Sequence, residues 1–122
     1  MGMSEESIEP LKRALFLSPA APERDAWLLE IGDVHLMAGR FDEALDWALR
    51  SRGNSRQIAL RDKILGATLA HLGRQDEARA AIARVNAVRP GQTIKLILGK
   101  RIPHPWDRNW IEGLVKAGIP RN

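Results

Sequence analysis

The chain contains no cysteine, no tyrosine and few aromatic residues of any kind. Without cysteine, neither a disulfide framework nor thiolate chemistry can contribute to its fold or function. Its apolar runs are far shorter than the roughly 20 residues that a membrane-spanning helix needs, so we expect no membrane partner. The N-terminus is acidic and lacks the apolar segment of a secretory leader. We therefore expect a cytoplasmic protein.

Positive and negative charges are concentrated in different halves of the chain. Residues 1–46 contain ten acidic and four basic side chains, whereas residues 47–122 contain five acidic and fifteen basic ones. Such asymmetry can indicate a polyanionic partner. However, four arginines of the basic half follow one another at intervals of five residues, so each is rotated by about 140° from the previous one on a helix. These arginines are Arg74, Arg79, Arg84 and Arg89. We interpret them as a solvated surface, and a nucleic-acid-binding module is a disfavoured alternative.

The main positive signal is a repeat with a period of 34 residues. The residues that recur are Gly32, Gly39, Arg40, Asp42, Glu43 and Ala44, as Gly66, Gly73, Arg74, Asp76, Glu77 and Ala78. A period of this length is typical of helix–turn–helix units, which bury their apolar faces by stacking on a neighbour. The repeat therefore predicts an all-α fold of antiparallel helix pairs and favours a binding or scaffolding role.

The two copies resemble tetratricopeptide repeats. Gly32 and Gly66 match the small residue at which two helices cross in that family, Ala44 and Ala78 match its alanine, and Pro90 matches the proline that ends a unit. The resemblance implies a right-handed α–α superhelix. It divides the single domain 1–122 into a half repeat at 4–19, repeats at 25–56 and 57–90, and a capping tail at 91–122.

The tail carries a second set of matches, namely Gly113, Leu114, Lys116, Ala117, Gly118 and Pro120. With these residues the tail resembles the C-terminus of long bacterial proteins in which tetratricopeptide repeats follow an adenylate or guanylate cyclase domain. This resemblance implies an alternative function as a regulatory segment of a nucleotide-cyclase-type signalling protein. It implies no cyclase activity, because the catalytic domain and its metal-binding aspartates are not in this sequence.

Several helix boundaries can be predicted from local chemistry. Gly39 and Gly73 are expected to end helices as left-handed residues, and Asp42 and Asp76 to cap the helices that follow. The helix that begins near Asp42 is expected to end at Gly53–Asn54. Further caps are predicted at Ser4, Ser55 and Asp107. The run 93–98 is compatible with a short helix or with a strand.

No arrangement of residues indicates a reaction. The three histidines, His35, His71 and His104, lack the short spacing of a metal site. The paired carboxylates Asp42/Glu43 and Asp76/Glu77 lie at helix starts, where acids interact favourably with the helix dipole. Nothing in the sequence indicates a cleft that would shift the pKa of a carboxyl group. We therefore expect no enzymatic activity, no cofactor and no metal.

A partner-binding groove follows from the resemblance, in which the first helix of each repeat lines a concave face. The corresponding residues are Leu29, Asp33, Leu36, Met37, Leu60, Lys63, Ile64, Ala67 and His71. This set is mainly apolar, and an exposed apolar patch usually marks an interface. We therefore expect a protein or peptide partner, with a homodimer through an open edge of the stack as an alternative. The chain's own tail or N-terminal helix could also cover the groove.

Overall fold

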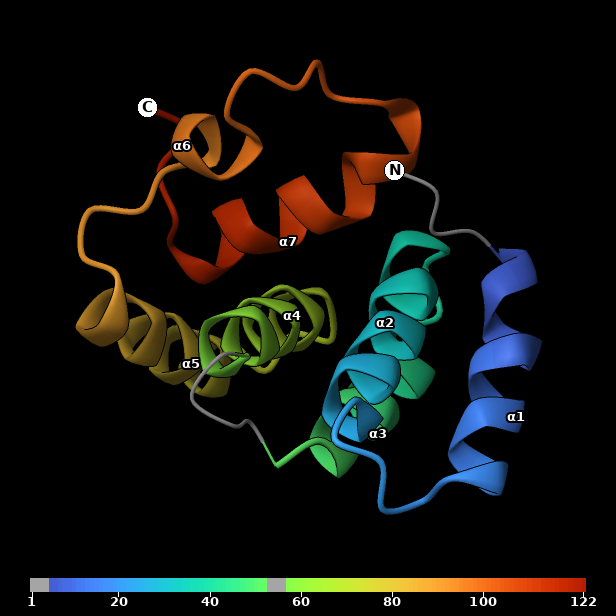
Figure 1. The fold of residues 1–122 in the computed structure, drawn as a ribbon. Coiled ribbons are helices and arrows are strands. Elements are labelled where there is room, and N and C mark those ends of the chain that lie inside the picture. Colours follow the sequence, from blue (N-terminus) through green and yellow to red (C-terminus); the bar gives the residue numbers. More distant parts are fainter. Residues whose placement is uncertain (1–4, 53–56) are drawn as a thin grey trace.

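All regular structure in the described chain is helical (Figure 1). The computed structural model describes residues 5–52 and 57–122, and no strand occurs among them. This confirms the all-α prediction and decides the run 93–98 in favour of a helix. The α-helices are α1 (Ile8–Leu17), α2 (Arg24–Met37), α3 (Phe41–Arg50), α4 (Ile58–His71), α5 (Gln75–Val88), α6 (Ile94–Leu98) and α7 (Arg108–Ala117), with short 3-10 turns η1 (Glu5–Ser7) and η2 (Pro105–Asp107).

Helices α2–α3 and α4–α5 form two hairpins with the same turn. Gly39 and Gly73 adopt φ angles of 84° and 79°, a region that favours glycine. In each turn the backbone N–H of the next residue, Arg40 or Arg74, donates to the carbonyl five positions earlier, at 2.8 and 2.9 Å. This pattern is a Schellman motif. The prediction that these glycines end their helices is therefore confirmed.

The predicted caps at Asp42 and Asp76 are wrong. The N-cap positions of α3 and α5 are Arg40 and Arg74, which the tight turn places directly after the glycine, and neither helix has a side-chain cap. Asp42 and Asp76 instead lie within the first helical turn, where a carboxylate still interacts favourably with the helix dipole. The predictions for Ser4, Gly53, Asn54 and Ser55 fall on positions outside the described residues.

The last predicted cap is confirmed in its position but not in its hydrogen bonding. Asp107 is the N-cap residue of α7, but its side chain makes no capping hydrogen bond to that helix. Its carboxylate instead accepts from the His104 N–H, while the His104 ring accepts from the Trp106 N–H, so that the two residues cap η2 reciprocally. The cap therefore stabilises the approach to α7 rather than its first turn.

The two repeated glycines lie where the helices of each hairpin cross. A Cβ atom on Gly32 would lie 3.3 Å from the Ala44 carbonyl oxygen, and one on Gly66 would lie 2.7 Å from Cδ1 of Ile82. Because such distances are too short for ordinary contact, the absence of a side chain allows the close approach. The alanines Ala44 and Ala78 on the partner helices are fully buried. The local packing that the repeat predicts is thus present in both hairpins.

The hairpins pack side by side, with α4 in contact with both α2 and α3. Helix α7 lies across α4 (Figure 1) and adds Leu114 and Ala117 to the same hydrophobic core. The tail also closes on itself, because the N–H of Ile94 in α6 donates to the Pro120 carbonyl at 2.9 Å. One core therefore holds both hairpins and the tail together.

Helix α1 packs on the other side of α2 (Figure 1). A smaller cluster of buried residues forms there from Ile8, Ile31 and Val34, and Trp47 and Trp106 pack against it. Trp106 belongs to the tail, so the tail contacts both ends of the molecule. Within the two stretches that the structure describes, no helix has the length and apolarity needed to cross a membrane.

Candidate functional site

Most of the predicted groove is not open. Leu29, Leu36, Ile64 and Ala67 are completely buried, so they cannot contact a partner while the protein is folded. The prediction that they line a free groove is wrong. Ile64 and Ala67 lie on α4, where α7 packs and fills this face, and Leu29 and Leu36 of α2 belong to the same hydrophobic core. Of the alternatives that the sequence left open, coverage by the chain's own tail therefore applies to the α4 part of the groove.

The contact between α7 and α4 is unusually close. A Cβ atom on Gly113 would lie 2.7 Å from both the Cβ and the carbonyl oxygen of Ala67. At the end of α4, Nε2 of His71 lies 2.6 Å from the carbonyl oxygen of Asn109, and its ring stacks on Phe41 with 4.2 Å between centroids. The predicted groove residue His71 therefore holds the tail in place.

Two other predicted residues, Leu60 and Lys63, lie on α4 and are not fully buried. Leu60 is 39% exposed, and Lys63 is partly buried, which together with nearby Arg89 lowers the pKa of its ammonium group. Neither residue borders the hollow described below.

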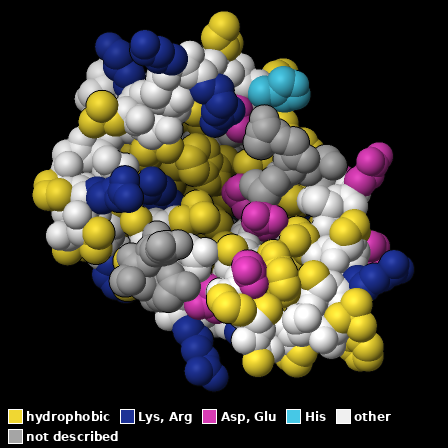
Figure 2. Space-filling model, in the orientation of Figure 1, with side chains coloured by type: hydrophobic (Ala, Val, Ile, Leu, Met, Phe, Trp, Pro, Cys, Tyr) yellow, Lys and Arg dark blue, Asp and Glu magenta, His cyan; other side chains and the backbone are white. Residues whose placement is uncertain are grey.

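Asp33 and Met37 line a hollow between α2, η1 and the start of the tail. Its volume is about 870 Å³. Figure 2 shows the depression, with hydrophobic side chains in its depth and acidic side chains along one side. The lining residues are Glu5, Glu6, Asp33, Met37, Arg101, Ile102, His104, Trp106, Asp107 and Trp110. A hollow of this size with apolar walls and a few convergent polar groups has the usual character of a binding site.

Asp33 is the most unusual residue of the hollow. It is only 8% exposed, and its Oδ1 has no hydrogen-bond partner among the described residues. Burial, with smaller contributions from the nearby negative charges of Asp107 and Glu30, raises the pKa of its carboxyl group to about 7, although Arg101 opposes this. Buried polar groups are normally satisfied, and strongly shifted groups in clefts are candidates for function.

Asp107 shows the opposite behaviour in the same hollow. Its Oδ2 accepts hydrogen bonds from Nη1 of Arg101 at 2.6 Å and from the His104 N–H at 2.8 Å. Burial alone would raise the pKa of this carboxyl group, but these partners outweigh burial and hold the pKa below its usual value. Asp107 is thus an ionised structural residue, whereas Asp33 is free to interact with something else.

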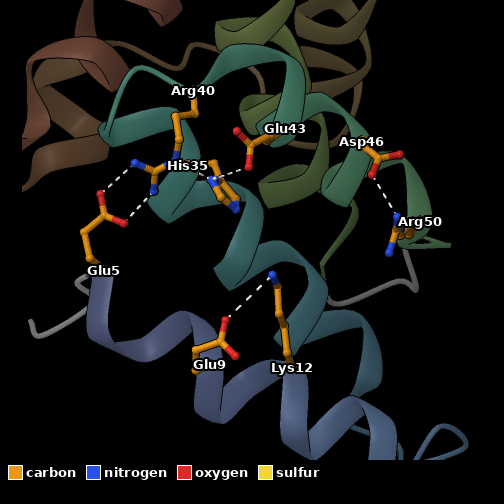
Figure 3. Close-up of polar contacts among 8 residues, drawn as sticks. All are labelled: Glu5, Glu9, Lys12, His35, Arg40, Glu43, Asp46 and Arg50. Atoms are coloured by element: carbon orange, nitrogen blue, oxygen red, sulfur yellow. Dashed lines mark hydrogen bonds and ion pairs between the residues drawn. The ribbon is translucent and has the colours of Figure 1, made fainter.

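Arg40 fixes the N-terminal wall of the hollow (Figure 3). Its guanidinium group donates to both carboxylate oxygens of Glu5 at 2.8 and 2.6 Å, and its Nε donates to Nδ1 of His35 at 2.8 Å. Because Nδ1 accepts this bond, the ring is neutral. Burial and the nearby Arg40 lower the pKa of His35. The contact ties η1 to the α2–α3 turn and so places Glu5 at the rim.

The tail residues of the hollow were not predicted from the sequence. Trp106 and Trp110 both line it, and the indole N–H of each is buried without an acceptor in the described chain. A signal was available, because half of the four tryptophans of the protein lie within the five residues 106–110. Trp106 lies in η2 and Trp110 in the first turn of α7, so both stand where the tail enters its last helix.

The hollow offers no metal centre. Among residues 5–52 and 57–122, no group of three or more histidine, aspartate or glutamate side chains could hold an ion. The paired carboxylates Asp42/Glu43 and Asp76/Glu77 are exposed on α3 and α5, away from the hollow lining. Comparison with protein-family models, curated proteins and solved structures found no match to this chain.

Proposed function

We propose that this protein is a non-enzymatic binding module that holds a short segment of a partner protein in the hollow beside α2. One observation carries the proposal: α7 fills the inner face of α4, whereas the face of α2 that bears Asp33 and Met37 borders an open space of about 870 Å³. Because the tail covers the inner face of α4, the inner face of α2 remains available to a ligand.

The lining of the hollow supports protein binding. Tryptophan, methionine and arginine are enriched at protein interfaces, and the hollow presents Trp106, Trp110, Met37 and Arg101. Ile102, at its edge, is 85% exposed, and burial of such a side chain by a partner would be favourable by about 1.5–3 kcal/mol. The volume suits a few residues of peptide.

We also propose that the two hairpins are tetratricopeptide-like repeats arranged as a right-handed superhelix. The identical Schellman turns and the glycine at each helix crossing support this. The tail departs from the pattern, since α7 packs mainly on α4 rather than on the second helix of the preceding pair. The open part of the concave face is consequently smaller than the resemblance alone implies.

A selection experiment tests the proposed function. Peptides selected on the intact protein from a random displayed library are synthesised and titrated, and the four tryptophan indole N–H signals are followed by NMR. We expect the signals of Trp106 and Trp110 to shift, and those of Trp27 and Trp47 to stay. Ile102→Ala should weaken binding at least tenfold through lost apolar burial, whereas Leu96→Ala, the matched change at an exposed leucine of α6, should not. Selected peptides that bind both variants alike would dismiss the hollow.

Self-association through the open edge at α1 is a second proposal. Phe16 and Leu17 are exposed at the end of this helix, and exposed apolar side chains favour contact with another chain. Light scattering over a concentration series, with Phe16→Glu as the comparison, tests it: a monomer at every concentration would exclude the homodimer. The nucleic-acid alternative gains no support from the hollow, because four carboxylates line it.

A further inference from the structure

We propose that the hollow recognises a primary ammonium group, from a lysine side chain or a peptide N-terminus of the partner, through the carboxylate of Asp33. This inference rests on the proposed function, because it specifies the chemistry of the segment bound in the hollow. It is carried by a buried carboxyl group without a partner, in a hollow whose charged lining is predominantly acidic.

Burial of the Asp33 carboxylate costs free energy that the rest of the described chain does not offset. An unpaired carboxylate is expensive to bury, yet the described chain supplies no donor for Oδ1. Arg101, the one guanidinium that lines the hollow, is engaged by Asp107. A donor brought by a ligand would satisfy Asp33. The two carboxylate oxygens exchange by rotation about a soft terminal torsion, so an approach from the hollow is possible.

The charge of the surroundings determines which ligands the hollow attracts. Besides Asp33, the hollow is lined by the acids Glu5, Glu6 and Asp107, against Arg101 and His104. Glu5 is paired with Arg40 and Asp107 with Arg101, so the remaining negative charge comes from Glu6 and Asp33, and Glu30 lies close enough to act on Asp33. A net negative lining attracts a cation and repels a carboxylate or phosphate. The ligand therefore carries a positive charge.

The lining also distinguishes an ammonium group from a metal ion. No group of three potential ligands occurs in the described residues, and the hollow is partly walled by tryptophan, which is not a metal ligand but interacts favourably with organic cations. An organic ammonium group is thus a better match than a metal ion.

Matched pairs of small ligands test the proposal on the intact 122-residue chain. Leucinamide is compared with N-acetyl-leucinamide for the terminal amine, and N-acetyl-lysine amide with N-acetyl-norleucine amide for the side chain. Binding is measured by NMR from the indole N–H signals, at constant ionic strength. We expect at least one amine to bind at least tenfold more tightly than its neutral counterpart and to shift the signals of Trp106 and Trp110. The pair with the larger preference identifies the source of the ammonium group.

Variants and pH sharpen this test. Asp33→Asn should abolish the preference for the amine, whereas Asp76→Asn, at an exposed carboxylate of α5, should leave it unchanged. Affinity for the lysine compound should rise from about pH 6 to about pH 8, because the pKa of Asp33 lies at about 7. Leucinamide should weaken again at higher pH as its own amine loses its proton.

Each contrary outcome is informative. Equal binding of charged and neutral partners through the hollow would overturn ammonium recognition while leaving the proposed function intact. If Asp33→Asn retained the preference, the assignment to Asp33 would be wrong. If calcium chloride shifted the indole signals and the amines did not, the hollow would take a metal ion and ammonium recognition would be wrong. If selected peptides and amines all failed to affect Trp106 and Trp110, both proposals would fall.

Discussion

The two hairpins of this protein share one design but differ in what covers their inner faces. Position 33 of the first corresponds to position 67 of the second in the 34-residue repeat. Ala67 is fully buried under Gly113 of the tail, whereas Asp33 borders a hollow. The first hairpin thus carries an ionisable residue, Asp33, at the position where the second carries a small apolar one, Ala67, that fits under α7.

A second pair of equivalent residues shows the same divergence. Arg40 of the first turn reaches out to Glu5 in η1, whereas Arg74 of the second turn pairs with Glu77 of its own helix at 2.8 Å. Identical local geometry therefore supports different long-range contacts. The comparison teaches that the repeats provide a scaffold, and that the segments packed on them determine whether a given face is closed or available.

The largest effect is expected when the second hairpin receives the aspartate that the first carries at the equivalent position. Ala67→Asp would place an unpaired carboxylate, and extra volume, in the closed contact with Gly113. We expect a loss of about 4 kcal/mol or more in the free energy of unfolding, measured by urea denaturation near pH 7. A loss below about 1 kcal/mol would show that the tail does not seal α4 in solution.

Removing the charge at the equivalent position of the open face should instead stabilise the protein. In the unfolded chain Asp33 ionises near 3.8, but in the folded protein it keeps its proton until about pH 7. Between these values the unfolded state binds fewer protons, so Asp33 makes stability fall as pH rises. Asp33→Asn should therefore be more stable than the wild type by up to about 4 kcal/mol at pH 8, with little difference near pH 4.

Urea denaturation over this pH range checks the prediction, with Asp76→Asn as the matched control at an exposed carboxylate. His35 acts in the opposite direction, because its lowered pKa makes stability fall as pH drops below about 6.5. A flat difference between wild type and Asp33→Asn across the range would contradict the burial of the Asp33 carboxyl group.

A smaller change tests the same α4–α7 contact from the α7 side. Gly113→Ala adds one methyl group that would lie 2.7 Å from the Ala67 carbonyl oxygen. We expect a loss of about 1–3 kcal/mol from overpacking, with faster hydrogen exchange in α7 than in α2. Lys116→Ala, at an exposed position of the same helix, should have little effect. Equal stability of the two variants would mean that α7 can shift without cost.

The smallest effect is expected at the turns. Arg40→Gln removes the contacts with Glu5 and His35, and Arg74→Gln removes only the contact with Glu77. The two carboxylate pairs are largely exposed, so the loss of each should cost no more than about 1 kcal/mol. Arg40→Gln also leaves the buried Nδ1 of His35 without its donor, so it should cost about 1 kcal/mol more than Arg74→Gln. Only Arg40→Gln should accelerate hydrogen exchange in η1. Both variants are measured by thermal denaturation and by hydrogen exchange. The same exchange rate in η1 for both would contradict the proposed difference between Arg40 and Arg74.

The local features were predictable because their causes lie close together in the chain. Gly39 and Gly73 end helices through their own backbone geometry, and the small residues at the crossings follow from a repeated pattern of residues. The wrong caps at Asp42 and Asp76 arose because a Schellman turn leaves no loop between the glycine and the next helix. The order of the elements could thus be read from the sequence, with errors of a residue or two.

The candidate site was predicted only in part. Asp33 and Met37 were named as lining residues, but so were Leu29 and Ile64, which are fully buried. An apolar residue on the inner face of a helix has the same sequence pattern whether a partner or the protein's own tail covers it. The tryptophans of the hollow escaped the prediction because they belong to no repeat.

The sequence by itself determined two matched helical hairpins, because period, turn glycines and small crossing residues act over a few positions. Only the tertiary structure decided which inner face is closed and which stays open. That choice depends on where a tail about forty residues further along the chain comes to rest: Gly113 presses on Ala67, while Trp106 reaches across to the cluster of Ile8, Ile31 and Val34. Packing between such distant segments is a property of the whole core, and no local pattern encodes it.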